Sequence, residues 1–137
     1  MIPTDSADMP SLSEEPEGGY IQVVEDDPHI LRQIEFALRT NGYAVATAIN
    51  GTDALRNMMH RPPRLLITDI MMPEMDGFEL VAMVRRDEIL AEVPVIMLTA
   101  RAEDITVAQA YNSGTDLYLT KPFNPTELLQ FVRRILD

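Results

Sequence analysis

Acidic side chains follow two short apolar segments of this sequence, an arrangement that suits metal binding or nucleophilic chemistry. Asp69 closes one apolar run and precedes the turn-rich segment 72–77, while Glu25 and Asp26 follow the apolar run 20–24. An apolar run of this length, bounded by turn residues, predicts a buried strand. Carboxylates that are forced together repel one another, and a divalent cation relieves that repulsion. The pattern therefore predicts a cation site at the ends of two strands.

Magnesium is the ion that this set of groups favours. Mg²⁺ prefers oxygen ligands and commonly uses one or two carboxylates, several waters and a phosphate oxygen. The predicted ligands are Asp26, Asp69 and the backbone carbonyl of Met71, with Glu25 acting through a bound water. The competing interpretation of the acidic run is a solvated loop that caps a helix, and Asp27 keeps a capping role here.

Two further polar residues stand at the ends of predicted strands. Thr99 closes an apolar run, and Lys121 directly follows another. Taken singly, Thr99 is explained as a satisfied turn hydroxyl and Lys121 as a solvated lysine. Taken together with the carboxylates, they add a hydroxyl donor and a cation to the same predicted edge, which favours a functional site.

The segments that position these residues alternate regularly along the chain. Strict alternation of strands and helices predicts an α/β fold with a doubly wound parallel sheet. Five strands favour the flavodoxin-like order 2-1-3-4-5, which places the first and third strands side by side where ligands bind. Glu25, Asp26 and Asp69 then converge. The predicted strands are 20–24, 43–48, 64–69, 93–99 and 117–120, and five helices are predicted to begin near 28, 51, 78, 103 and 125.

Composition narrows the class of protein. With 137 residues and 46 % hydrophobic content, the chain fits one globular domain. The absence of cysteine excludes disulfides and thiolate metal sites, and a formal net charge of −11 argues against direct nucleic-acid binding. Residues 1–19 hold five acidic and no basic side chains, so we predict a disordered acidic leader there. No membrane span or signal peptide is predicted, which indicates a cytoplasmic protein.

Over residues 20–137, the sequence closely resembles the receiver domain of bacterial two-component response regulators. The motifs that carry the resemblance agree with the family in order and spacing. A glutamate opens the acidic pair where the family pattern has an aspartate. The matching motifs are Glu25-Asp26, Asp69 within 69–77, Thr99-Ala100, Tyr118 and Lys121-Pro122-Phe123.

The resemblance implies a phosphorylation-activated signalling switch and not a conventional enzyme. Asp69 is then the phosphoacceptor, with Mg²⁺ and Lys121 neutralising charge. Thr99 would bind the phosphoryl group, and Tyr118 would turn inward to change the surface of helix 4, strand 5 and helix 5. The resemblance also implies a cis Lys121-Pro122 bond, whereas general frequencies favour trans.

The resemblance further implies the classes of partner. A sensor histidine kinase or phosphotransfer protein would supply the phosphoryl group, and an output protein or output domain would receive the signal. The resemblance is also compatible with a homodimer that forms on phosphorylation. We expect either a stand-alone receiver or one cut from a longer regulator.

Three other functions are weaker explanations. A magnesium-dependent phosphohydrolase would need an acid where Met71 stands, and a phosphorylation-independent module would lack an acceptor, acid or lysine, all of which are present. A nucleotide-binding protein would need a glycine-rich loop ending in Gly-Lys-Ser or Gly-Lys-Thr. His29 and His60 are expected to be solvated.

Overall fold

In the described part of the chain, strands and helices alternate as predicted, except between the last two strands, where most residues lie outside that part. The computed structural model describes residues 19–100, 105–106, 109 and 113–137. Apart from Gly19, the predicted leader lies outside the described residues, and so does most of the fourth predicted helix, 103–112. The described elements are β1 (Tyr20–Val24), α1 (Pro28–Thr40), β2 (Ala44–Ala48), α2 (Gly51–His60), β3 (Leu65–Asp69), α3 (Gly77–Arg86), β4 (Val95–Thr99), β5 (Leu117–Thr120) and α5 (Pro125–Leu136).

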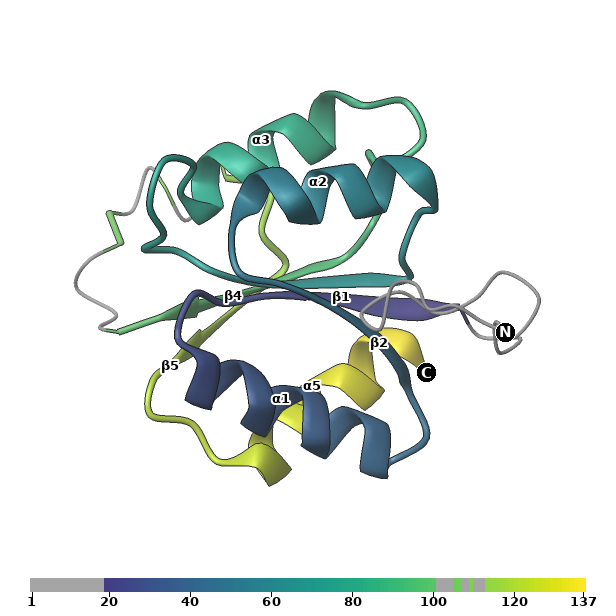
Figure 1. The fold of residues 1–137 in the computed structure, drawn as a ribbon, viewed down its shortest axis with the longest axis vertical. Coiled ribbons are helices and arrows are strands. Elements are labelled where there is room, and N and C mark those ends of the chain that lie inside the picture. Colours follow the sequence, from purple (N-terminus) through teal and green to yellow (C-terminus); the bar gives the residue numbers. More distant parts are fainter. Residues whose placement is uncertain (1–18, 101–104, 107–108, 110–112) are drawn as a thin grey trace.

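The five strands form one parallel sheet, and the predicted order is confirmed. The order is β2-β1-β3-β4-β5, with Val24 opposite Thr68 and Asp69 opposite Leu98. Helices α1 and α5 cover one face of the sheet, and α2 and α3 cover the other (Figure 1). The carboxyl ends of β1 and β3 are therefore neighbours, which places the acidic residues that follow them at one edge.

Both faces of the sheet bury apolar side chains, which explains why the central strands have continuous apolar runs. Alternate residues of one strand belong to different cores. Val24 and Leu66 pack under α2 and α3, whereas Val23 and Ile67 pack toward α1 and α5. A strand buried on both faces has no solvent side that would favour polar residues. The core thus holds the backbone of β1 and β3 rigidly beneath the acidic residues.

Three strands begin later than predicted: those expected at 43–48 and 64–69 begin one residue later, at Ala44 and Leu65, and the third begins two residues later. The strand expected at 93–99 begins only at Val95. Pro94 has no backbone N–H and cannot donate to the ladder, although its carbonyl accepts a hydrogen bond from Leu66 N at 2.9 Å. The apolar character of Val93 reflects its burial in the loop before the strand.

Helix caps fix the chain directly after the acidic strand ends. Asp27 accepts hydrogen bonds from His29 N at 2.8 Å and Ile30 N at 3.4 Å, which confirms its predicted role as the N-cap of α1. Asp76 and Glu79 form a capping box at the start of α3. Such caps contribute about 1 kcal/mol each and set where the loops end.

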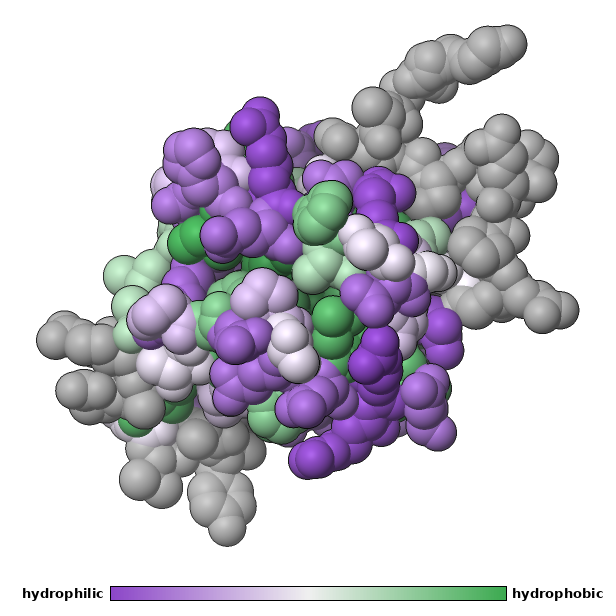
Figure 2. Space-filling model, turned by 90° about the horizontal axis from the view of Figure 1, so that it is seen from below, coloured by the Kyte–Doolittle hydropathy of each residue, from purple (hydrophilic) through white to green (hydrophobic). Residues whose placement is uncertain are grey.

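The outer face of α1 and α5 is mostly polar. Figure 2 shows this face with hydrophilic side chains over most of it and smaller apolar areas between them. Phe36 on α1 is 74 % exposed, but single exposed apolar residues are ordinary on protein surfaces. No helix in the described part of the chain combines the length and the apolar character needed to cross a bilayer.

Candidate functional site

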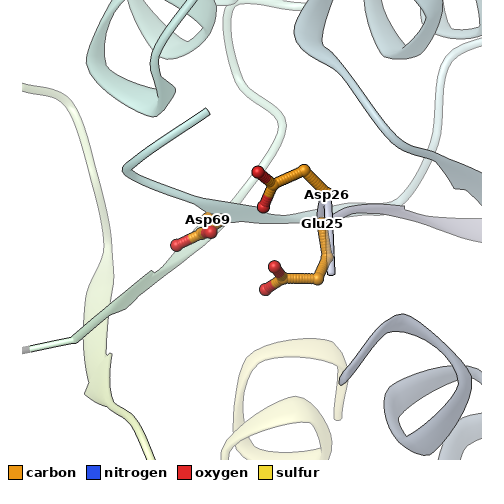
Figure 3. A group of neighbouring side chains, drawn as sticks. All are labelled: Glu25, Asp26 and Asp69. Carbon is orange, nitrogen blue, oxygen red and sulfur yellow. The ribbon is translucent and has the colours of Figure 1, made fainter. Parts of the chain in front are cut away.

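Three carboxylates meet at the carboxyl edge of the sheet. Glu25 and Asp26 follow β1, and Asp69 is the last residue of β3. One carboxylate oxygen from each lies within 4.8 Å of the other two. Figure 3 shows the Glu25 and Asp26 side chains extending toward the side on which Asp69 lies. The convergence that the strand order predicts is therefore present.

The three carboxylates differ in their access to solvent. Glu25 is fully buried and Asp69 is 5 % exposed, whereas Asp26 is exposed. The Glu25 carboxylate also accepts a hydrogen bond from Asp27 N at 3.1 Å. The acidic pocket is thus closed beneath Glu25 and open on the side of Asp26, so an ion or a phosphoryl group can approach from solvent.

Lys121 lies against two of these carboxylates. Its Nζ atom is 2.8 Å from Glu25 Oε1 and 3.1 Å from Asp69 Oδ2. The Lys121 backbone N–H donates to Thr99 O at 2.7 Å, which holds β5 beside β4 at this edge. The Lys121-Pro122 peptide bond is cis, as the resemblance implied and contrary to the general preference for trans.

The ion pair between Lys121 and Glu25 is a feature that sequence reasoning missed. Glutamate is one methylene longer than aspartate, and here it reaches the ammonium group directly. The signal was present in the departure from the family's usual acidic pair. The lysine is therefore shared between Glu25 and the predicted phosphoacceptor.

Burial and neighbouring charges change the protonation of this pair. Burial raises the pKa of Glu25 from 4.5 to about 7, although the hydrogen bond from Lys121 acts in the opposite direction. Burial alone would lower the pKa of Lys121, but its hydrogen bond to Glu25 and the charge of Asp69 outweigh burial and raise that pKa above 10.5. Lys121 is consequently cationic at neutral pH, while Glu25 is only partly ionised.

We expect Mg²⁺ affinity to rise about tenfold between pH 6 and pH 8. Below its pKa of about 7, Glu25 is protonated and loses the negative charge that attracts a cation. Raising the pH ionises Glu25, so the affinity increases with pH until the carboxylate is fully charged. Titrations of Mg²⁺ across this range would measure the change.

A Glu25→Gln variant is the control for this pH dependence. Glutamine keeps the length of the side chain but cannot titrate, so its Mg²⁺ affinity should vary by less than about twofold over the same range. An equally steep pH dependence in Glu25→Gln would assign the titration to another group.

The loop between β3 and α3 brings the backbone close to Asp69. Gly77 N donates to Ile70 O at 2.8 Å, and a Cβ atom at Gly77 would lie 2.4 Å from the Asp69 carbonyl oxygen. Only glycine permits this approach. Met71, in this loop, is 70 % exposed, and the role of its backbone carbonyl as a metal ligand stays a prediction.

Thr99 and Tyr118 lie on the two strands that follow β3 in the sheet. Thr99 is 2 % exposed at the end of β4, one residue beyond the partner of Asp69. Tyr118 pairs with Met97 across β4 and β5, and its hydroxyl lies 2.7 Å from Ser113 Oγ. Sequence reasoning missed this contact with Ser113. Thr99 therefore lies at the same edge of the sheet as the acids. Tyr118 lies level with Met97, two residues before Thr99 and so farther from that edge.

The two histidines are exposed, as expected. His29 is in the first turn of α1 and His60 in the last turn of α2. Neither belongs to the acidic group. The candidate site therefore contains oxygen donors and one ammonium group.

The donor set fits Mg²⁺. The ligands available are carboxylate oxygens, which are the atoms that this ion prefers, and one of the three carboxylates is open to solvent. When all three carboxylates are ionised, the ammonium of Lys121 balances one of them, and the pocket retains two negative charges in excess. A divalent cation would neutralise that excess and would relieve the repulsion that accompanies the raised pKa of Glu25.

Fold and site together define a class of protein: a five-stranded parallel α/β domain with an acidic pocket and a lysine at the carboxyl edge of its sheet. The family model of the response regulator receiver domain matches residues 21–133. The chain belongs to this family, whose members act in two-component phosphorelay signalling.

Individual relatives agree with this assignment. The chain is 39 % identical over 116 residues to the DNA-binding dual master transcriptional regulator RpaA of Synechocystis sp., covering 85 % of this chain and 48 % of that protein. It is 34 % identical over 122 residues to Protein PilG of Pseudomonas aeruginosa, covering 89 % and 90 %. The chain thus spans about half the length of RpaA but most of PilG.

Solved structures show the same fold. The chemotaxis response regulator CheY4 of Vibrio cholerae superposes with a TM-score of 0.79 at 32 % identity, covering 85 % of this chain and 98 % of that chain. These similarities concern the receiver domain itself.

Proposed function

We propose that this protein is a phosphorylation-activated signalling switch in which Asp69 accepts a phosphoryl group from a sensor histidine kinase or a phosphotransfer protein. One observation carries the proposal. The Asp69 carboxylate stands at the carboxyl edge of the sheet, 3.1 Å from the Lys121 ammonium and within 4.8 Å of the other two acids. A nucleophile beside a fixed cation is the arrangement that phosphoryl transfer requires.

The chemical step follows from this arrangement. An oxygen of Asp69 attacks the phosphorus of the partner's phosphohistidine, the bond between phosphorus and the imidazole nitrogen breaks, and the imidazole leaves with its electron pair. Lys121 neutralises charge on the phosphoryl oxygens, and the Thr99 hydroxyl donates a hydrogen bond to one of them. Mg²⁺, held by Asp26, Asp69 and the Met71 carbonyl with Glu25 nearby, would supply further charge neutralisation when bound.

The proposed output is a change in surface. A phosphoryl group on Asp69 adds negative charge and acceptor oxygens, which draw Thr99 toward them. The space that Thr99 vacates allows Tyr118 to turn inward, and the surface formed by helix 4, β5 and α5 changes. Helix 4 lies largely outside the described residues, so this part of the proposal rests on Thr99 and Tyr118.

Partners follow from the same role. We propose a sensor kinase or phosphotransfer protein upstream and an output protein or output domain downstream, in the cytoplasm. We also propose that phosphorylation allows two copies of the chain to associate through the altered surface. We do not propose that this chain binds nucleic acid directly.

Phosphorylation of the purified protein tests the proposed function. Incubation with Mg²⁺ and acetyl phosphate, or with a phosphorylated histidine kinase, should add one phosphoryl group with the hydroxylamine sensitivity of an acyl phosphate. Intact-protein mass spectrometry measures the gain. The proposal fails if no phosphoryl group is added from either donor while Mg²⁺ binding is normal.

Replacing Asp26 with alanine should weaken Mg²⁺ binding at least tenfold, which corresponds to about 1.4 kcal/mol. Asp26 is the one exposed carboxylate of the three, so its loss removes a ligand without leaving a buried charge unpaired. Isothermal titration with Mg²⁺ would measure the affinity.

The matched control is Asp27→Asn. It removes one negative charge from the neighbouring position, and asparagine can still cap α1. We expect its affinity for Mg²⁺ to change less than threefold, because Asp27 accepts bonds from the helix backbone. Equal losses in the two variants would show that only the general charge of the loop matters.

A further inference from the structure

Tyr118 is tied to the turn that precedes its own strand. Its hydroxyl lies 2.7 Å from Ser113 Oγ, while its ring packs, partly buried, against the core under α2 and α3. Ser113 Oγ also accepts a hydrogen bond from Thr115 N at 3.2 Å. A serine hydroxyl has one hydrogen and two lone pairs, so Ser113 satisfies both partners together. The Tyr118 ring is thereby held in one orientation.

The turn that carries Ser113 is anchored by Arg85 of α3. The carbonyl oxygen of Gly114 accepts hydrogen bonds from Arg85 Nη2 at 2.6 Å and from Arg85 Nε at 3.1 Å. Ser113 N donates to Gln109 O at 3.0 Å. A guanidinium group presents its donors in a fixed planar fork, so two bonds to one carbonyl fix its position closely.

Arg85 is itself held from several sides. It donates to Ala91 O at 2.9 Å and to Val93 O at 2.7 Å, and its side chain is only 26 % exposed. Asp116 completes the anchor, because its carboxylate lies 3.3 Å from Arg85 Nη2 and accepts a bond from Val95 N at 2.7 Å. The turn is therefore fixed both to α3 and to the start of β4.

Gly114 makes the close approach of Arg85 feasible. Its φ angle is +79°, a value that residues with a Cβ atom rarely adopt, and a Cβ atom there would lie 3.0 Å from Arg85 Nε. Glycine supplies the backbone shape and the space that the two bonds from Arg85 need.

We propose that the Ser113 hydroxyl is a latch on Tyr118, positioned by Arg85, which stabilises the orientation of Tyr118 in the unphosphorylated protein. Ser113 and Arg85 are then positioning residues that act through Tyr118 and have no contact with the phosphoryl group. The regulatory part rests on the proposed function, because it takes Tyr118 as the residue that moves. The hydrogen bond between the Tyr118 hydroxyl and Ser113 must break before Tyr118 can change its orientation. The latch therefore affects the equilibrium between the two orientations of Tyr118.

Fluorine NMR of the unphosphorylated full chain, carrying 3-fluorotyrosine, tests the latch. Tyr118→Phe assigns the Tyr118 resonance by its disappearance. Ser113→Ala should increase the population of the alternative Tyr118 orientation about fivefold, the effect of losing one hydrogen bond of ordinary strength. Ser113→Thr retains a hydroxyl and should keep the wild-type resonance.

Two arginine variants test the anchor. Arg85→Gln should shift the Tyr118 resonance in the same direction as Ser113→Ala, because the turn loses its bonds to α3. Arg86→Gln changes the neighbouring arginine, which is exposed, and should leave the resonance in place. Equal effects of the two variants would overturn the role of Arg85.

Binding of beryllofluoride, a stable mimic of a phosphoryl group, tests the regulatory consequence. With the latch removed, Ser113→Ala should bind beryllofluoride about fivefold more tightly in the presence of Mg²⁺. A wild-type resonance in Ser113→Ala would overturn the latch, and an unchanged affinity would overturn its regulatory role. If the wild-type protein takes up neither beryllofluoride nor phosphate, the proposed function fails, whereas the NMR comparison still decides whether the latch exists.

Discussion

Replacing Asp69 with asparagine is expected to abolish phosphorylation by acetyl phosphate and by a phosphorylated kinase. The amide has nearly the shape of the carboxylate, but it is not a nucleophile toward phosphorus. Asp69 is 5 % exposed and lies 3.1 Å from Lys121, so the isosteric change disturbs packing little. Mass spectrometry of the intact protein after incubation with Mg²⁺ and the donor would show no gain in mass.

Asp76→Asn is the matched control for this experiment. Asp76 is a carboxylate in the loop between β3 and α3, where it caps α3, and asparagine is an equally good cap. The control should accept a phosphoryl group as the wild-type protein does. Equal labelling of Asp69→Asn and the wild type would remove Asp69 as the acceptor and would point to another carboxylate of the pocket.

Gly77→Ala is expected to lower the free energy of unfolding by about 1–3 kcal/mol, and toward the upper end of that range, which is typical of overpacking. The added Cβ would lie 2.4 Å from Asp69 O and 3.0 Å from Ile70 Cα, which are backbone atoms, and 2.7 Å from Met97 Sδ. A flexible side chain could move aside, but the backbone beneath the site cannot. Urea unfolding would measure the loss.

Gly42→Ala separates steric conflict from backbone conformation. Gly42 has a φ angle of +92°, and a Cβ atom added there would meet nothing within 4 Å, so alanine at this position introduces only conformational strain of about 1 kcal/mol. Gly77 has no such φ angle, and its penalty arises from contact. A loss at Gly77 no larger than the loss at Gly42 would contradict the close approach of α3 to the end of β3.

The local pattern of the sequence carried most information about the architecture. Apolar runs bounded by turn residues located the strands, because a strand buried on both faces favours apolar side chains at nearly every position. Asp27 followed by Pro28 located the start of α1, because capping and the fixed φ angle of proline act within a few residues. Boundaries were less certain, as Val93 shows: its burial in a loop resembles the burial of a strand residue.

The contacts around the switch could not be predicted in the same way. The bond between Ser113 and Tyr118 depends on where Arg85, 28 residues earlier than Ser113, holds the turn. Likewise, the reach of Glu25 to Lys121 depends on the separation of β1 and β5 across the sheet. A serine in a turn and a glutamate after a strand have many explanations when only their neighbours in sequence are known.

The sequence by itself determined the alternation of strands and helices, the family, and the set of residues at the strand ends, because these depend on periodicity, on short-range turn chemistry and on motif spacing. Only the tertiary structure decided that Lys121 forms ion pairs with both Glu25 and Asp69, and that Arg85 holds the turn beside Tyr118. The physical reason is that burial and charge depend on distances in space. A pKa of about 7 for Glu25 arises only when the folded sheet removes that carboxylate from water.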